Sequence, residues 1–370
     1  MIEALVTFAV SVVVNLLVLR VAKKHPHALD HDFSGPQKFH HKAVPRIGGV
    51  GILLGMAAGL LAFGLAPWQG ARVDETRYIG WLLLACSIPA FGAGIIEDLT
   101  KRVSPGKRLL ATALSGLLAA WLLGAVIRHT ATPGIDTLVV TTVGAYAFTL
   151  LVVAGTANSV NIIDGFNGLA SMCVVIMMSA VAYVAYQAND SVVFTLALLG
   201  IGATLGFFIW NFPAGSIFLG DGGAYFLGFL FAELSILLLV RNPGEVSPLF
   251  PLLVCIYPVF ETVFSAYRRK VLRGQSAGSP DGMHLHSLIY RRVMRRALEE
   301  DDVRALTHRN SMTSPFLWLL CMLSVVPAVL FWDQTALLAV CLVLFVATYL
   351  ALYWSIVRFR SPAWIHVGRP

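Results

Sequence analysis

Charged side chains are scarce in this sequence, and their scarcity excludes most classes of soluble protein. Asp, Glu, Lys and Arg make up 13% of the 370 residues, whereas roughly 25% is usual in soluble domains. Hydrophobic residues make up 57%, and the mean hydropathy is +0.76. A spanning helix needs about 20 consecutive apolar residues, and such runs recur between short polar breaks. Because lipid leaves unpaired backbone groups unsatisfied, these runs predict membrane helices.

Paired cysteines, long linkers and convincing internal repeats are also lacking. The five cysteines have spacings that suggest neither a metal knuckle nor a disulfide framework, and each lies in an apolar run. They are Cys86, Cys173, Cys255, Cys321 and Cys341. We therefore interpret them as small core residues, and we expect a single integral membrane domain over residues 1–370.

Eleven apolar runs are long enough to be spans, which predicts an all-α, polytopic membrane helical bundle. The first run lacks a basic segment before it and a cleavage site after it, so it favours a retained helix over a signal peptide. The predicted spans are 2–19, 47–66, 78–96, 108–128, 139–157, 168–187, 192–210, 224–240, 248–266, 314–332 and 335–357.

The basic residues predict the orientation of the bundle, since Lys and Arg near span ends are retained in the cytosol. Of the 27 basic residues, 23 fall in residues 20–46, 97–108 and 267–313 or after residue 357. These segments alternate along the chain and would share one side. We therefore expect the N-terminus outside and the C-terminus in the cytosol. The net charge of +7 is explained by topology and needs no nucleic-acid partner.

Glycines recur every four residues at Gly51, Gly55 and Gly59 and again at Gly202 and Gly206. This spacing places them on one helix face and favours close helix packing. A phosphate-binding role for Gly48 to Gly51 is the alternative, although a soluble phosphate loop would need a preceding strand.

The loops predicted to be cytosolic carry carboxylates, amides and histidines at unusual density, and this is the main functional evidence. The loops concerned are 20–46, 97–108, 158–168, 211–223 and 267–313. Asn158, Asn161, Asp164 and Asn167 are each three residues apart, so in a helix they would share one face. Burying four such groups without partners would cost a few kcal/mol each. They therefore indicate a ligand or ion, and a solvated helix terminus is the alternative.

Asp221 lies between Gly220 and Gly222, where glycine permits a phosphate or metal to approach the backbone. Carboxylate and amide oxygens suit Mg²⁺, which takes one or two protein ligands and completes its shell with phosphate and water. The alternating His284 and His286 lack a third zinc ligand, so they favour phosphate binding. Glu233 and Glu261 lie inside predicted spans, where a carboxylate is a functional hypothesis by default.

Together, these segments resemble the polyprenyl-phosphate N-acetylhexosamine-1-phosphate transferase family (glycosyltransferase family 4). The likeness covers residues 20–290 and includes six ordered motifs. The motifs are Pro45 to Gly49, Glu97-Asp98, Asn158 to Leu169, Asn211 to Ala214, Phe218 to Asp221 and His284 to His286.

The resemblance implies a role for each candidate residue and a bundle of ten or eleven helices. Asp221 and Asn161 would hold Mg²⁺, with Mn²⁺ able to replace it, and Asp98, Asp164 and Glu97 would be catalytic. The implied substrate-binding residues are Arg46, Lys38, His40, Lys107, Asn158, Asn167, Asn211, His284 and His286. Among these, Asn167 would contact uracil, whereas Lys107 and the histidines would bind phosphates.

The implied reaction joins a UDP-N-acetylhexosamine to a polyprenyl phosphate such as undecaprenyl phosphate at the cytosolic face of the bacterial inner membrane. The products would be polyprenyl diphosphate sugar and UMP, in the first membrane step of a cell-envelope glycan such as O-antigen; a homodimer remains open. Two departures matter. The family's usual paired aspartates appear as Glu97-Asp98, which places the greater weight on Asp98. Met283-His284-Leu285-His286 stands where the peptidoglycan branch has three histidines. This difference favours a UDP-N-acetylhexosamine as the donor, and phospho-N-acetylmuramoyl-pentapeptide transfer is the alternative. A lipid or solute transporter is the rival from another class.

Overall fold

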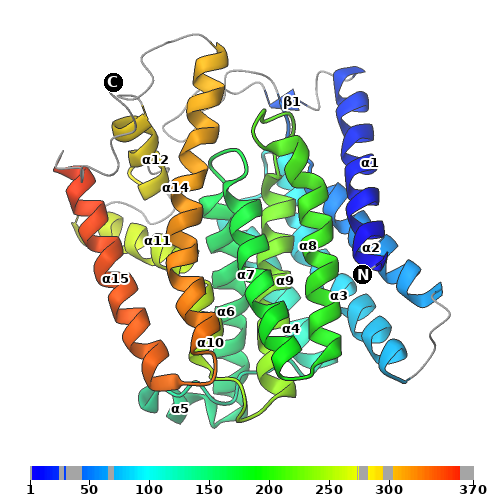
Figure 1. The fold of residues 1–370 in the computed structure, drawn as a ribbon, viewed down its shortest axis with the longest axis vertical. Coiled ribbons are helices and arrows are strands. Elements are labelled where there is room, and N and C mark those ends of the chain that lie inside the picture. The colour runs from blue at the N-terminus through cyan, green and yellow to red at the C-terminus, as the bar shows by residue number, and fades with distance from the viewer. Residues whose placement is uncertain are drawn as a thin grey trace.

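The computed structural model of the chain is a bundle of helices (Figure 1). It describes residues 2–24, 29–30, 44–65, 71–272, 274, 282–294 and 303–358. Two residues predicted to bind substrate, Lys38 and His40, lie outside these ranges.

Nearly every described segment is helical. The α-helices are α1 (Ile2–Lys24), α2 (Gly49–Leu65), α3 (Ala71–Thr100), α4 (Pro105–Leu122), α5 (Pro133–Val139), α6 (Thr142–Ile163), α7 (Leu169–Gln187), α8 (Ser191–Asn211), α9 (Gly220–Arg241), α10 (Leu249–Val254), α11 (Ile256–Tyr267), α12 (Leu285–Leu288), α14 (Val303–Leu330) and α15 (Thr335–Val357). Two π-helical turns, η2 (Arg268–Leu272) and η3 (Ile289–Met294), extend α11 and α12. The strands β1 (Leu29–Asp30) and β2 (Val44–Pro45) form one short antiparallel pair.

The prediction of a polytopic helical membrane protein is confirmed. Within the described ranges, eight helices are long and apolar enough to cross a membrane: α1, α3, α6, α7, α8, α9, α14 and α15. The other three predicted spans correspond to α2, α4 and a run that divides into α10 and α11.

The division of the 248–266 run has a local cause. α10 ends at Val254 and α11 begins at Ile256, with Cys255 between them. Because Pro258 has no N–H, it cannot donate to the carbonyl of Val254 as the next turn of a continuous helix requires. Hydropathy predicts one helix here because it does not register this missing donor.

α9 is the central helix of the bundle and packs against α2, α3, α6, α7 and α8 (Figure 1). Its residues from Gly220 to Leu238 are all buried, as expected for a helix that is apolar on every face. The first residues of this buried helix therefore have a fixed position relative to their neighbours.

The four-residue glycine spacing does serve helix packing. A Cβ at Gly51 would lie 2.1 Å from the Asn15 side chain, and one at Gly55 would lie 2.8 Å from the Thr7 carbonyl. On α8, a Cβ at Gly206 would lie 2.5 Å from the Phe8 carbonyl. These glycines let α2 and α8 approach α1 closely.

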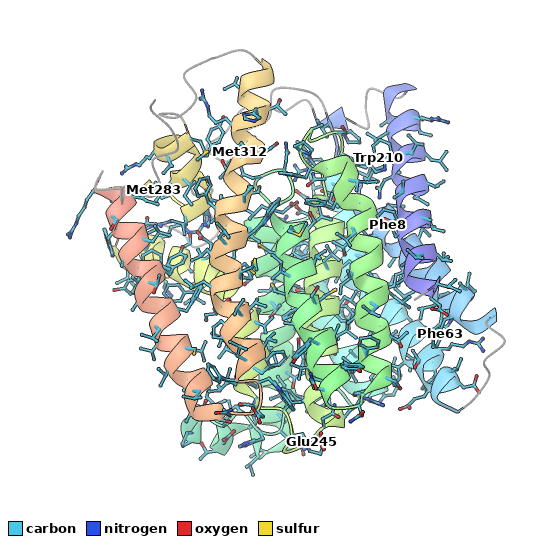
Figure 2. All side chains as sticks on the ribbon, in the orientation of Figure 1. Phe8, Phe63, Trp210, Glu245, Met283 and Met312 are labelled. Carbon is cyan, nitrogen blue, oxygen red and sulfur yellow. The ribbon has the colours of Figure 1, made fainter. Side chains whose placement is uncertain are left out.

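One end of the bundle gathers the loops that the sequence singled out. The end of α1, β1, α12 and the start of α14 lie there, whereas α5 lies at the opposite end (Figure 1). Figure 2 shows Trp210, Met283 and Met312 toward the first end and Glu245 at the other. Trp210 precedes Asn211 and Met283 precedes His284. We call this first end the site end.

Candidate active site

Asp221 stands in the first turn of α9 and is the centre of a polar cluster at the site end. The side-chain amide of Asn161 donates to Asp221 Oδ1 over 3.1 Å, and Arg108 binds the other carboxylate oxygen. Arg46 Nη2 lies 3.8 Å from Asp221 Oδ1. Residues from α4, α6 and the turn between β2 and α2 therefore converge on the Asp221 carboxylate of α9, and Asn161 meets Asp221 as the sequence predicts.

Asp98, at the end of α3, holds the N-terminus of α9. Its two carboxylate oxygens accept hydrogen bonds from the backbone N–H groups of Asp221 and Gly222, each over 3.0 Å. Its side chain is 0% exposed, and Arg46 Nε lies 3.8 Å from Asp98 Oδ1. A carboxylate here satisfies donors that have no partner within α9 and complements the positive end of the helix dipole.

Glycine makes this convergence of backbones possible. A Cβ at Gly94 would lie 2.4 Å from the Gly222 nitrogen, and one at Gly49 would lie 2.4 Å from the Gly223 Cα. Gly220 has φ +76°, and a Cβ there would lie 1.9 Å from the Arg46 carbonyl oxygen. We call Gly49, Gly94, Gly222 and Gly223 the glycine crossing, because α2, α3 and α9 meet there.

The polar face predicted from Asn158 to Asn167 is only partly helical. α6 ends at Ile163, so Asn158 and Asn161 lie on its last turns, whereas Asp164 is the cap and Asn167 follows in a turn. Asn158 donates to the Ala154 carbonyl over 2.7 Å. The prediction that Asn167 shares this face is wrong, because the chain turns at Gly165 and Gly168 has φ +73°.

Asp164 is half-buried beside the cluster, and both its burial and the charges of the cluster change its pKa. Desolvation raises the pKa of Asp164 to about 7. Arg46 opposes this rise, while the carboxylates of Asp221 and Asp98 add to it. Desolvation and the nearby Asp221 carboxylate also raise the pKa of Asp98 to about 7. Three carboxylates close together, with two arginines among them, therefore leave two acids that can gain or lose a proton near neutral pH.

Asn167 and Asn211 are buried and face the protein's own backbone. Asn167 donates from its side chain to the Pro213 carbonyl over 3.1 Å, and its N–H donates to Asn310 Oδ1 over 2.9 Å. Asn211 accepts from the Gly168 N–H over 2.5 Å and donates to the Ile217 carbonyl over 2.7 Å. In this arrangement the two amides tie the loops of the site to each other and to α14.

His284 and His286 lie beside the Asp164 loop. Their rings stack with centroids 5.1 Å apart, and the His286 ring packs against Phe166 at 5.6 Å. A Cβ at Gly165 would lie 3.3 Å from His286 Nε2. Glu261 of α11 binds His284 Nδ1 over 2.9 Å. The histidine pair therefore lies next to the carboxylate cluster, and the Glu261 carboxylate holds the His284 ring in place.

Two residues predicted to belong to the site, Lys107 and Glu97, lie outside the contacts of Asp221 described above. Lys107 is exposed, whereas the adjacent Arg108 reaches Asp221. Glu97 accepts from the Val103 N–H over 2.7 Å and so closes its own loop. Sequence reasoning missed Arg108, although its position one residue from Lys107 on a helix is a signal that helical spacing could have used.

The cluster fits a magnesium ion that is completed by substrate. Among the described residues, no three His, Cys, Asp or Glu side chains form a ready ligand set. The side chains present offer oxygen donors, which Mg²⁺ prefers, and Mg²⁺ commonly takes only one or two protein ligands beside phosphates. Asp221 would be the first ligand of the ion. Asn161 would be the second ligand, with its side-chain amide rotated so that the oxygen, and not the NH₂ group, faces the ion.

Comparison with known proteins identifies the family of the chain. A protein-family model described as glycosyl transferase family 4 matches residues 80–239, which include Asp98, Asn161 and Asp221. A probable undecaprenyl-phosphate N-acetylglucosaminyl 1-phosphate transferase of Bacillus subtilis is 31% identical over 290 residues, 77% of each chain.

Two further relatives have related names. A decaprenyl-phosphate N-acetylglucosaminephosphotransferase of Mycobacterium tuberculosis is 27% identical over 310 residues, covering 76% of this chain and 72% of the relative. A phospho-N-acetylmuramoyl-pentapeptide-transferase of Rhodococcus jostii is 28% identical over 313 residues, covering 72% of this chain and 84% of the relative. With a relative at this identity over most of both chains, and with the family's motifs gathered at one end of the bundle, this chain belongs to glycosyl transferase family 4.

Proposed function

We propose that this protein transfers N-acetylhexosamine 1-phosphate from a UDP-sugar to a polyprenyl phosphate at the cytosolic face of the bacterial inner membrane. The products are polyprenyl diphosphate sugar and UMP, and the reaction is the first membrane step of a cell-envelope glycan such as O-antigen. The observation that carries the proposal is the meeting of Asn161, Arg108 and Arg46 on Asp221 at the site end.

The chemistry follows from charge and position. An oxygen of the lipid phosphate attacks the β-phosphorus of the nucleotide sugar, and the bond from that phosphorus to the bridging oxygen breaks, so UMP leaves. Arg46 and Arg108 supply positive charge beside the diphosphate, as phosphoryl transfer requires. Asp221 and Asn161 would hold Mg²⁺, which would supply further neutralisation of the negative charge on the diphosphate.

A strong general base is unnecessary for this reaction. The second pKa of a phosphate monoester is about 6, so the lipid phosphate already carries most of its negative charge at cytosolic pH. Asp98 is excluded from solvent and has both oxygens bound by N–H groups. Its contribution is to hold α9, and with it Asp221, in place.

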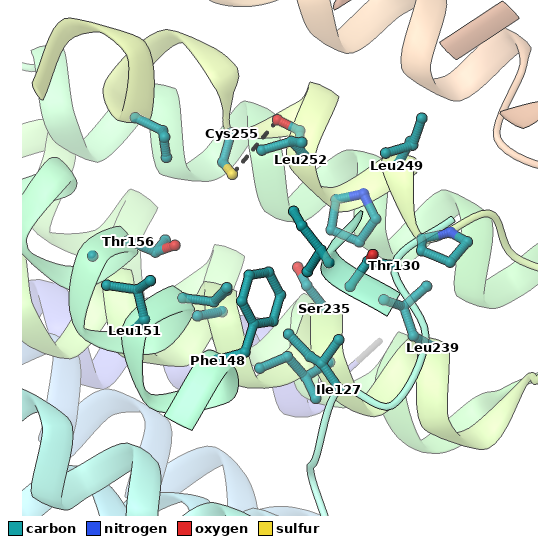
Figure 3. Close-up of a pocket in the computed structure, with 18 of the residues that line it drawn as sticks. Ile127, Thr130, Phe148, Leu151, Thr156, Ser235, Leu239, Leu249, Leu252 and Cys255 are labelled. Atoms are coloured by element: carbon teal, nitrogen blue, oxygen red, sulfur yellow. Dashed lines mark hydrogen bonds between the residues drawn. The ribbon is translucent and has the colours of Figure 1, made fainter. Parts of the chain in front are cut away.

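An apolar cavity supports a lipid substrate. The cavity has a volume of about 400 Å³ and lies between α6, α9, α10 and α11, with lining residues that include Ser159, Ile236 and Val259. Figure 3 shows Leu252 and Cys255 on one side of it and Leu151 and Phe148 on the other. The lining extends from Ile135 of α5, at the opposite end of the bundle, to Ser159 near the site end of α6. A polyprenyl tail in this cavity would therefore lie along α6, with the end nearer Ser159 closer to the cluster.

Leu252→Trp is expected to raise the KM for undecaprenyl phosphate about ten-fold, because the indole overfills the cavity. The KM for geranyl phosphate, whose short tail does not extend along the cavity, should stay unchanged. Steady-state UMP release with each lipid measures both values.

The matched control for this variant is Leu319→Trp. Leu319 is also an exposed leucine, on α14, and it is absent from the cavity lining. It should leave both KM values at the wild-type level. An equal rise for both lipids in Leu252→Trp would contradict the placement of the tail.

Mg²⁺ binding is expected to release a proton from Asp164. With a pKa of about 7, this acid is roughly half protonated at neutral pH, and a nearby cation favours its ionised form. Addition of MgCl₂ to weakly buffered protein should release up to one proton per chain, most of it near pH 7 and less at alkaline pH, where Asp164 is already ionised. A pH indicator dye measures the release.

Asp164→Asn should lower the number of protons released, whereas Asp74→Asn, an exposed aspartate at the start of α3, should not change it. Asp98, whose pKa is also about 7, is still present in Asp164→Asn and should supply the remainder. KCl at equal ionic strength controls for screening. An unchanged proton count in Asp164→Asn would exclude Asp164 as a source.

The reaction itself is tested by release of UMP from UDP-N-acetylglucosamine with undecaprenyl phosphate and Mg²⁺ in detergent. Other UDP-N-acetylhexosamines and UDP-N-acetylmuramoyl-pentapeptide complete the donor panel. Turnover with the pentapeptide donor alone would establish the alternative branch of the family. Movement of lipid or solute across proteoliposomes without release of UMP would favour a transporter.

A further inference from the structure

A chain of buried contacts links the last helix to the histidine pair. The Tyr349 hydroxyl of α15 donates to Glu261 Oε2 over 2.6 Å. The other oxygen, Glu261 Oε1, accepts from the Leu285 N–H and binds His284 Nδ1, each over 2.9 Å. Tyr349, Glu261 and His284 are each at most 3% exposed.

We propose that Tyr349 and Glu261 are positioning residues that fix the ring orientation and the tautomer of His284. The C-terminal helix would thereby be a working part of the catalytic site. This inference rests on the proposed function, in which the histidines contact substrate phosphates, and it extends that function to two residues outside the six motifs.

The hydrogen-bond geometry carries the argument. A carboxylate at Nδ1 keeps the proton on that nitrogen, so this contact sets both the tautomer and the orientation of the ring. Glu261 has both oxygens occupied, which compensates a buried charge and leaves the carboxylate little freedom to rotate. Glu233 differs, because neither of its buried oxygens has a hydrogen-bond partner among the described residues.

Stacked histidine rings connect Glu261 and Tyr349 to the carboxylate cluster. His284 stacks on His286, and His286 packs beside Gly165, the residue next to Asp164. A tilt of the His284 ring would therefore displace His286 relative to the carboxylates. α15 packs against α10, α12 and α14, so its contribution to this site is made through specific side chains.

Tyr353 provides a matched control one turn along α15. Its hydroxyl accepts from Arg268 Nη1 over 2.5 Å and lies 3.3 Å from the Met283 carbonyl, so it supports the same loop without a contact to Glu261. Tyr349→Phe and Tyr353→Phe each remove one buried hydroxyl. A merely structural role for Tyr349 predicts the same result for both variants.

The experiment measures kcat and KM of UMP release for Tyr349→Phe, Glu261→Gln and Tyr353→Phe, with the unfolding temperature of each. We expect Glu261→Gln to lower kcat about 10- to 100-fold and Tyr349→Phe to lower it about five-fold, with KM for the UDP-sugar nearly unchanged. Tyr353→Phe should keep wild-type kcat.

The rate per folded molecule distinguishes positioning from folding. A variant that only loosened the fold would have a lower unfolding temperature and a wild-type kcat per folded molecule. Loss of positioning should instead lower kcat in Glu261→Gln and Tyr349→Phe at an unfolding temperature equal to that of Tyr353→Phe.

A second readout needs no turnover. In ¹⁵N-histidine-labelled protein in lipid, solid-state NMR should show a ring protonated at Nδ1 that disappears in His284→Gln. The same signal should shift in Glu261→Gln and Tyr349→Phe and stay in place in Tyr353→Phe. If the wild type releases no UMP, the proposed function fails, and the NMR series still decides whether these residues position the ring. Wild-type kcat and ring signal in Tyr349→Phe and Glu261→Gln would overturn the inference.

Discussion

Asp221→Asn is expected to lower Mg²⁺-dependent UMP release by on the order of 10³-fold. The substitution removes the charge on which Arg46, Arg108 and Asn161 converge. It also removes the best ligand for a cation at the diphosphate, which is worth several kcal/mol of transition-state stabilisation, and about 4 kcal/mol corresponds to roughly 10³-fold in rate. A titration of initial rate against MgCl₂ measures the effect.

Asp190→Asn is the matched control for this variant. Asp190 also pairs with an arginine, since Arg241 Nε lies 2.9 Å from Asp190 Oδ2, but it lies at the opposite end of α9. Its replacement should lower the unfolding temperature and leave the rate per folded molecule close to that of the wild type. Wild-type turnover by Asp221→Asn would remove Asp221 from the site.

Asp98→Asn is expected to lower turnover about 10²- to 10⁴-fold and also to destabilise the fold. An asparagine offers one acceptor oxygen where two N–H donors now bind, so its NH₂ group would face the N–H of Asp221 or Gly222. An unsatisfied buried donor costs about 1–3 kcal/mol. Rate and unfolding temperature should therefore fall together.

The pH profile separates the two roles open to Asp98. If Asp98 holds α9 in place, Asp98→Asn keeps the wild-type shape of the profile at a lower rate. Loss of the acidic limb, with an unchanged unfolding temperature, would instead identify Asp98 as a proton acceptor. Asp74→Asn, at the exposed start of the same helix, should change neither quantity.

Hydropathy was sufficient to place the helices because a backbone in lipid must satisfy its hydrogen bonds internally, and in a single apolar run only a helix does so. Each of the eleven predicted runs overlaps a helix or, at 248–266, a divided pair. The missing hydrogen-bond donor at Pro258 contributes to the division but is not sufficient alone, since α3 continues through Pro89 and α14 through Pro327. The average hydropathy of the run does not contain this information.

The convergence of Asn161, Asp98 and Asp221 could also be predicted. Residues on alternate loops must share a side of the membrane, and the basic residues mark which loops share it. Polar side chains at high density on one side of the membrane then find their hydrogen-bond partners in each other, because lipid offers them none. Their meeting required no knowledge of helix packing.

The direction of individual side chains could not be predicted in the same way. Asn167 and Asn211 have the composition of ligand-binding amides, yet their partners are backbone groups of Pro213, Gly168 and Ile217. The pairing of Glu261 with His284 joins residues 23 positions apart. Such contacts depend on the position of a turn or the rotation of a helix, and neither leaves a periodic trace in the sequence.

The glycine crossing restricts how this enzyme can diversify. At Gly49 and Gly94, where α2 and α3 meet α9, even a methyl group would come within 2.4 Å of a backbone atom of α9, so these two positions are closed to variation. Evolution toward a different donor sugar must therefore proceed through more peripheral parts of the chain, such as the segment around the histidine pair, while the centre is inherited unchanged.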